Sequence, residues 1–245
     1  LFSAVAKRVV RDYHFRPVMP IHLSDQSDLK ELSAEPFATM DNKPRSTDMT
    51  ASAAPKAEED EYFRRIDECA ANRTSVTIPN SLPTHARYLM TKMFSLSKSQ
   101  VRLFSGKLER TVDRGGNSGC PPAAVYGDAN LLEAVQRFLA RENVVLRVLV
   151  QQDVDGGLAS HPLVSLISGM KENGTLKGTV EFRQLQGEQT KIENHFMVAD
   201  NSAYRLEFDH DPCQAQANFN NVSIARGLID AFDNYLFTKA RVLHP

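Results

Sequence analysis

A short, almost uninterrupted run of apolar residues, Val144–Val150, constrains the fold of this chain more than any other feature. Arg147 is the one charged residue within it. A strand that is apolar on both sides is typical of the centre of a sheet whose two faces are both covered by helices. The run therefore predicts a layered α/β domain and places one strand near the middle of its sheet.

Helical and extended patterns alternate on both sides of this run. Apolar residues recur at helical spacing, which predicts helices over 83–97, from Asp128 to Leu139, over 161–170 and over 223–240. Alternating or β-branched segments predict strands over 74–78, 101–105, 179–185, 196–199 and 204–208. This order favours a mixed, mainly parallel sheet flanked by helices, with the last two strands as an antiparallel edge.

The first quarter of the chain has a different composition. Residues 21–60 are rich in Ser, Asp, Pro, Ala and Thr, and the segment Asp41–Pro55 has too few large apolar side chains to offset its ordering entropy. The acidic run Glu58–Asp60 then suits the first turn of a helix. We expect residues 1–57 to form a partly extended, partner-binding segment with a flexible linker, and residues 58–245 to form the α/β domain.

Charge and cysteine content exclude several function classes. Lys and Arg number 29 against 30 Asp and Glu, so a nucleic-acid partner would need a local basic patch. Cys69, Cys120 and Cys213 are too widely spaced for a metal-ligand pair or a disulfide framework, which is typical of reduced thiols. No apolar run approaches the ~20 residues of a membrane helix. We therefore expect a cytoplasmic protein without membrane contact, bound metal or other cofactor.

The segment Lys191–Asp200, followed by Asn218-Phe219-Asn220, resembles the core of the phospholipase D superfamily. In that superfamily a strand with a His-x-Lys motif continues through four mostly apolar residues to an Asp. A second strand follows, and then a Gly-Ser-x-Asn-like turn that opens a helix. The resemblance covers roughly residues 73–241, and it implies a single repeat of the phospholipase-D-like α/β fold.

The catalytic pair of the superfamily is missing in either alignment. When Asp200 is matched to the Asp of the motif, the Lys position falls on His195 and the His position on Glu193. When His195 is matched to the His instead, Met197 takes the Lys position and Ser202 the Asp position. A carboxylate at position 193 would repel a phosphodiester, whereas a His–Lys pair attracts it.

The turn of the motif is only partly preserved, because Asn218 is present but Ala215 and Gln216 replace Gly and Ser. The resemblance therefore implies a catalytically degenerate subunit that binds a partner protein or nucleic acid in a larger assembly, in a bacterial defence or nucleic-acid-processing setting. The alternative is a divergent phosphodiesterase or nuclease whose site is completed across a homodimer, with His195 and Asn218 as catalytic groups. The candidate ligand-binding residues are Glu193, His195, Arg205, Glu207, Asn218 and Asn220.

The role of the charged residues in this set stays open at the level of sequence. Arg205 and Glu207 are two residues apart on a predicted strand, so they project from the same face. They form either a remnant ligand site with His195 or Glu193, or a buried ion pair between strands. A single repeat also leaves uncovered the surface that its twin would occupy. We therefore expect a homodimer or a complex with a second protein through the face around Glu193, His195 and Asn218.

Overall fold

The computed structural model describes residues 53–106, 108, 125–151, 158–186, 192, 194–209 and 214–243. The chain divides into two compact units, Leu1–Ala57 and Glu58–Pro245. The first described element is the helix α2, Ala53–Ala71. The last three residues of the linker expected over 41–55 therefore belong to this helix, and the rest of that segment lies outside the described residues.

The described residues of the second unit build one eight-stranded sheet. Its strands are β1 (Ile78–Asn80), β2 (Gln100–Ser105), β3 (Val145–Val150), β4 (Thr179–Gln184), β5 (His195–Ala199), β6 (Ala203–Asp209), β7 (Gln214–Asn218) and β8 (Arg241–Leu243). Their spatial order is β1-β7-β6-β5-β2-β3-β4-β8. The strands β2, β3 and β4 are parallel, and every other pair of neighbours among these strands is antiparallel.

The predicted mixed α/β sheet is confirmed, but its parallel part is confined to three strands. The strands β5 and β6 extend the sheet from β2 instead of ending it, because β7 and β1 follow them. The sequence did not predict β7, since its Gln-Ala alternation has little of the β-branched or aromatic character of most strands. Pairing with β6 supplies the backbone hydrogen bonds that make this segment a strand. The first strand begins at Ile78 and not at Thr74 for the same reason, since its pairing partner is β7.

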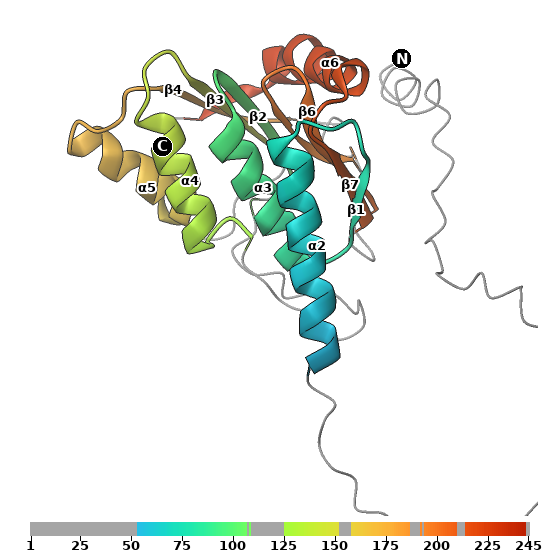
Figure 1. Cartoon of the computed structure of the whole chain (residues 1–245). Coiled ribbons are helices and arrows are strands. Elements are labelled where there is room, and N and C mark those ends of the chain that lie inside the picture. The colour runs from blue at the N-terminus through green and yellow to red at the C-terminus, as the bar shows by residue number, and fades with distance from the viewer. Residues whose placement is uncertain are drawn as a thin grey trace, which may run out of the picture. The chain divides into compact units, whose positions relative to one another are not determined.

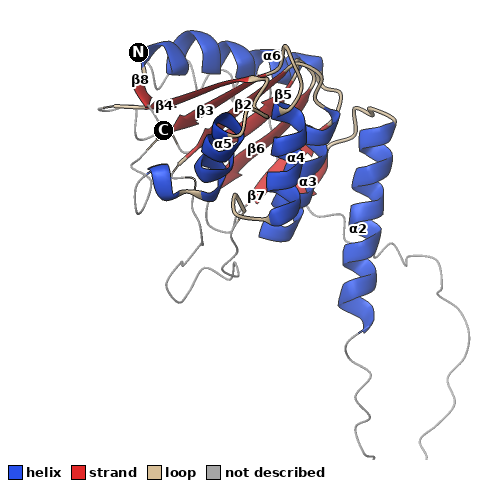
Figure 2. Cartoon of the chain, turned by 90° about the vertical axis from the view of Figure 1, so that its left-hand side faces the viewer, coloured by secondary structure: helices blue, strands red, loops and turns tan. Residues whose placement is uncertain are grey.

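Helices cover both faces of the sheet (Figures 1 and 2). The helices α3 (Pro83–Leu96), α4 (Ala129–Leu139) and α5 (Pro162–Glu172) lie on one face, and α2 packs beside α3. The short helix η1, Leu158–Ser160, precedes α5. On the other face, α6 (Val222–Asp230) continues into a π-helical turn, η3 (Ala231–Leu236), and a final turn, η4 (Phe237–Lys239). The single closing helix predicted over 223–240 is thus three segments.

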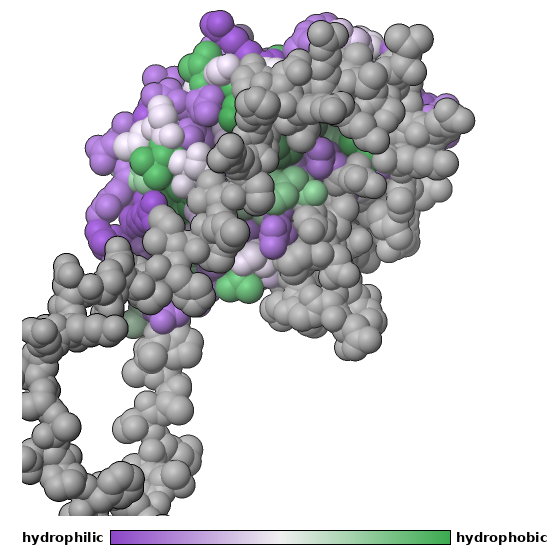
Figure 3. All heavy atoms as spheres, turned by 90° about the vertical axis from the view of Figure 1, so that its right-hand side faces the viewer, coloured by the Kyte–Doolittle hydropathy of each residue, from purple (hydrophilic) through white to green (hydrophobic). Residues whose placement is uncertain are grey.

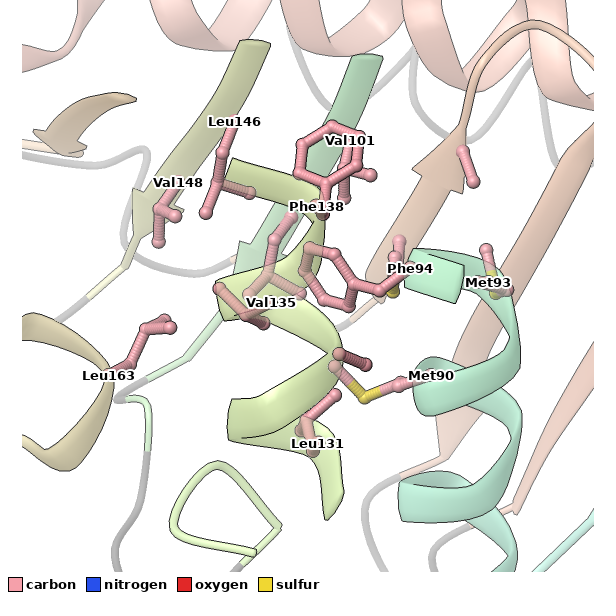
Figure 4. Packing of buried hydrophobic residues seen from close by; sticks show 14 of the residues in the cluster. Met90, Met93, Phe94, Val101, Leu131, Val135, Phe138, Leu146, Val148 and Leu163 are labelled. Carbon is pink, nitrogen blue, oxygen red and sulfur yellow. The ribbon is translucent and has the colours of Figure 1, made fainter. Parts of the chain in front are cut away.

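Alternating residues of each central strand supply two separate cores. In β2, Val101 and Leu103 pack under α3 and α4, whereas Phe104 packs under α6. Figure 4 shows the first core, in which Phe94 of α3 and Phe138 of α4 meet edge-on above the sheet at a centroid distance of 5.8 Å. Burial of the sheet on both faces explains why β3 has only one polar residue, Arg147.

The one charged residue of the central strand belongs to an ionic network under the π-helical turn. Arg147 lies beside Arg102 of β2, and the carboxylate of Asp233 in η3 contacts both guanidinium groups. The distances are 2.6 Å from Arg102 Nη2 and 3.3 Å from Arg147 Nη1. Arg147 Nε also lies 3.1 Å from Glu181 Oε1 on β4. The shared carboxylate offsets the repulsion of the two arginines and ties the closing helix to the sheet.

The carboxylate of Asp200 connects the turn between β5 and β6 to the segment that joins α3 and β2. It accepts hydrogen bonds from the backbone N–H groups of Lys98, Ser99 and Gln100 at 2.9 to 3.1 Å. The hydroxyls of Ser97 and Ser99 donate to it at 3.0 Å. Asp200 itself has a φ of 53°, a left-handed conformation that Asp and Asn tolerate better than most residues.

Replacement of Asp200 by Asn should destabilise the domain in a pH-dependent way. Burial acts to raise the pKa of Asp200, but the hydrogen bonds from Lys98, Ser99, Gln100 and Ser97 outweigh it and hold the pKa below its ordinary 3.8. A lowered folded-state pKa adds stability above the unfolded-state pKa, and that stability is lost as the pH falls through the folded-state value. We expect Asp200→Asn to cost about 2 kcal/mol at pH 7 and clearly less near pH 3. Urea unfolding at both pH values tests this, and an equal cost at both would contradict it.

Candidate functional site at the carboxyl edge of the sheet

The three parallel strands end at the same border of the sheet, here called the carboxyl edge. Ser105, Val150 and Gln184 are their last residues. Because β5 and β6 run antiparallel to their neighbours, β5 begins at this edge with His195, and Glu207 lies opposite it on β6. Ligands of open α/β sheets bind outside the carboxyl ends of the strands. This edge is therefore the first place to look for a site.

The imidazole of His195 is closely surrounded. Its Nε2 lies 2.9 Å from Oε1 of Gln151, a residue just beyond β3 that is 4% exposed. The ring of Phe104 meets the imidazole edge-on at a centroid distance of 5.5 Å. At Gly106, a Cβ atom would lie 2.7 Å from Cε1 of His195, so only glycine leaves room for the ring. These contacts fix the orientation of His195.

This hydrogen bond determines the chemistry that His195 can perform. An amide oxygen only accepts hydrogen bonds, so Nε2 carries a proton in this arrangement. Catalytic histidines are usually oriented by a carboxylate, which also stabilises the imidazolium form. The neutral amide of Gln151 orients the ring without providing that charge.

A second polar group lies on β6 and β1. Arg205 is buried, and its Nη1 lies 3.1 Å from Glu207 Oε2, so the residues predicted to share a face do form an ion pair. Its Nε donates to Asn80 Oδ1 at 3.1 Å across the intervening strand β7. The residues of β7 that pair beside this contact are Ala215 and Ala217, whose small side chains let the guanidinium extend over the strand.

The structure places the asparagines of the predicted motif apart from His195. Asn218 pairs with Tyr204, at the opposite end of the sheet, because β7 crosses the sheet once more before α6 begins. Its side chain is 1% exposed, donates to Ser75 O and accepts from Asn220 N, each at 2.9 Å. Asn220 is an exposed residue of the same turn. Glu193 lies outside the described residues.

Sequence reasoning missed three residues of this edge. Gln151 is the first polar residue after the apolar central strand, and that position was a usable signal. Gly106 follows β2 in a similar way. The sequence did not indicate Asn80, because β1 has only three residues and is defined as a strand by its pairing with β7.

Among the residues that the structure describes, no group of three or more His, Cys, Asp or Glu side chains could hold a metal ion. None of the described helices is both long enough and apolar enough to span a membrane.

The chain matches the model of a known family over most of the domain. Residues 83–238 match the model of the family described as "Domain of unknown function (DUF7931)". This chain belongs to the DUF7931 family. The matched region runs from the start of α3 into η4, so His195 and Arg205 lie inside the DUF7931 region and Asn80 precedes it. A comparison with curated proteins finds no match.

Three solved structures show distant likeness to this DUF7931 chain. TrmBL2, an archaeal chromatin protein whose structure shows "a novel mode of DNA binding", is 14% identical over 78% of this chain, with a TM-score of 0.46. NucT from Helicobacter pylori is 7% identical and phosphatidylserine synthase from Haemophilus influenzae Rd KW20 is 8% identical, each over 69% of this chain with a TM-score of 0.40.

The part of each solved structure that this chain covers differs widely. The chain covers 64% of the TrmBL2 chain, 99% of the NucT chain and 40% of the synthase chain. With TM-scores of 0.46 and 0.40, these likenesses decide neither the fold nor the ligand of this chain.

Replacement of Gly106 by Ala should displace His195 and break its bond to Gln151. The added Cβ would overlap Cε1 of the ring, and overpacking of this kind typically costs about 1–3 kcal/mol. We expect a lower free energy of unfolding together with changed NMR shifts of the His195 ring. Gly169→Ala is the control, because a Cβ at that position meets nothing within 4 Å. An unchanged His195 signal in Gly106→Ala would contradict the described packing.

Proposed function

We propose that this chain is a non-catalytic, phospholipase-D-like subunit that binds a partner through the carboxyl edge of its sheet. The observation that supports this proposal best is the bond between His195 and the neutral amide of Gln151. In the register that matches Asp200, His195 falls on the Lys position of the superfamily, and its Nε2 proton is directed at Gln151 Oε1. The side chain of His195, which would contact a phosphate in the superfamily, is thus engaged in a hydrogen bond within the domain.

The remaining charges of the edge support the same proposal. Arg205 is paired with Glu207, so the described ionic groups here largely neutralise one another. A nucleic-acid backbone is bound mainly by cationic groups that replace its counterions. A polar edge with paired charges suits a protein surface better, because the rims of protein interfaces are polar and hydrogen-bonded. A partner protein or a second copy is therefore the occupant that we favour.

Exposed hydrophobic residues are the alternative to the polar edge as a surface for a partner. Where grey atoms do not cover the face seen in Figure 3, hydrophobic residues, in green, lie in small groups among hydrophilic residues. Large exposed apolar side chains of the described residues come from separate elements: Val76, Leu82, Leu96, Phe208, Val222, Tyr235 and Val242. The polar carboxyl edge is thus a better candidate for recognition than an apolar face.

A second candidate function is a phosphodiesterase whose site is completed by a second copy of the chain. The location of His195 at the carboxyl edge favours it, because open α/β sheets place reactive groups there. The two functions differ in a simple way: a shared active site turns over a phosphodiester, and a binding edge does not.

We expect no hydrolysis of bis-nitrophenyl phosphate, DNA or RNA by the purified chain, since neither register of the motif pairs a His with a Lys. Release of nitrophenol and gel analysis of labelled nucleic acids measure this directly. Turnover that survives metal chelation and disappears in His195→Ala would favour the phosphodiesterase instead.

Replacement of His195 by Arg should lower binding of the partner at least about tenfold, because a longer charged side chain disturbs the edge. Affinity capture from the source cells with identification by mass spectrometry, together with light scattering, measures both partner proteins and a second copy. Asn220→Arg is the matched control, since Asn220 is exposed at the opposite end of the sheet. A monomer at micromolar concentration that captures no protein would contradict the proposed function, and specific capture of nucleic acid alone would change its partner.

A further inference from the structure

Asn80 at the carboxyl edge has an unsatisfied hydrogen-bond donor. Its side chain is 4% exposed, and its Oδ1 accepts from Arg205 Nε at 3.1 Å. Its Nδ2, however, is buried and has no hydrogen-bond partner. A buried amide donor left unpaired costs free energy, so such groups in folded proteins call for an explanation, such as a bound water, ion or ligand.

The neighbour of this donor is a guanidinium group. Arg205 is 9% exposed, and the hydrogen bonds to Asn80 and Glu207 occupy its Nε and one N–H of Nη1. Arg has a planar fork of five N–H donors, so these two bonds leave further donors for a ligand. A guanidinium beside an amide N–H is a typical arrangement for binding an oxyanion.

The same place is bordered by the helices α2 and α3. The Tyr62 hydroxyl of α2 donates to Pro79 O at 3.0 Å, next to Asn80, and its ring stacks on that of His85 at 3.8 Å. Burial raises the pKa of Tyr62 above its ordinary value of 10, while the nearby charge of Arg205 acts to lower it. Tyr62 therefore lies beside His85 and next to the backbone of Asn80.

Two further observations concern the beginning of α3. His85 Nδ1 is also buried and without a hydrogen-bond partner. The N-terminus of α3 has no side-chain cap at Leu82. Polar groups of β1, β6 and α3 are thus gathered around one tyrosine ring, and a low local dielectric strengthens their attraction for an anion.

We propose that Asn80 and Arg205 bind one oxyanion group, a phosphate or a carboxylate, beside Tyr62. The proposal deepens the proposed function and rests on it, because it names the chemical group that a partner presents at the carboxyl edge. Glu207 already neutralises part of the charge of Arg205, so the site takes a single oxyanion and not a stretch of phosphates. A terminal or side-chain carboxylate and a phosphorylated side chain share this chemistry.

Titration of the full chain with inorganic phosphate and with acetate, followed by calorimetry at constant ionic strength, tests the site. We expect saturable binding of at least one of the two anions, and the tighter ligand identifies the group. Asn80→Asp keeps an oxygen for Arg205 Nε and replaces the free donor by a carboxylate oxygen that repels an anion. This variant should weaken binding at least about tenfold.

Gln216→Glu is the matched control. Its Nε2 is likewise buried without a partner, but it lies next to Ala215 and Ala217 on β7 and therefore faces the opposite side of the sheet. The same change of charge there should leave anion binding within about twofold of the wild-type value. If Asn80→Asp fails to fold, Arg205→Lys serves as the second variant, because it keeps the charge and removes the planar fork.

Two outcomes would overturn the inference: no binding of either anion at about 10 mM, a very weak affinity, or unchanged binding in Asn80→Asp and Arg205→Lys. Failure of the proposed function is distinguishable from both. Anion binding that persists in a chain that captures no partner counts against the proposed function alone. Capture that depends on His195 in a chain that binds neither anion counts against this inference alone.

Discussion

The carboxylate of Asp200 holds together two parts of the domain that are far apart in the sequence. The residues that donate to it belong to the connection between α3 and β2, and Lys98 is 102 positions away along the chain. Asp200 therefore holds the end of β5 beside the start of β2, where the parallel half of the sheet joins the antiparallel half. The register of β5 against β2 in turn places His195 at the carboxyl edge.

A second ionic contact stabilises the other face of the sheet. Asp233 lies on the π-helical turn η3 and contacts Arg102 and Arg147, which are adjacent on β2 and β3. A π-helical turn changes which side chains of a helix face its neighbour, and such turns often occur at functional positions. Here the turn coincides with Asp233, which contacts the buried Arg102 and the partly buried Arg147. The carboxylate of Asp200 thus connects β5 to the start of β2 at the centre of the sheet. The carboxylate of Asp233 connects the closing helix to one face of the sheet.

The carboxyl edge follows from the same geometry. The edge gathers residues from strands that are distant in sequence, and the charges meet partners within the domain: His195 meets Gln151, and Arg205 meets Glu207 and Asn80. This internal pairing supports the proposed binding role, because a phosphodiester-cleaving site needs cationic groups directed at its substrate. The exception is the buried Nδ2 of Asn80, which has no hydrogen-bond partner. This donor is the basis for the proposed binding of a single small anion.

The sequence by itself determined the α/β class, the central strand, the major helices and the shared face of Arg205 and Glu207, because these depend on local periodicity and on alternation along one strand. Only the tertiary structure decided that β7 and β1 extend the sheet, that Asn218 lies far from His195, and that Gln151 and Asn80 complete the edge. The Gln-Ala pattern of β7 has weak strand character, and three residues are too few to mark β1 as a strand. Their hydrogen bonds come from strands elsewhere in the chain, and no local pattern specifies such a pairing.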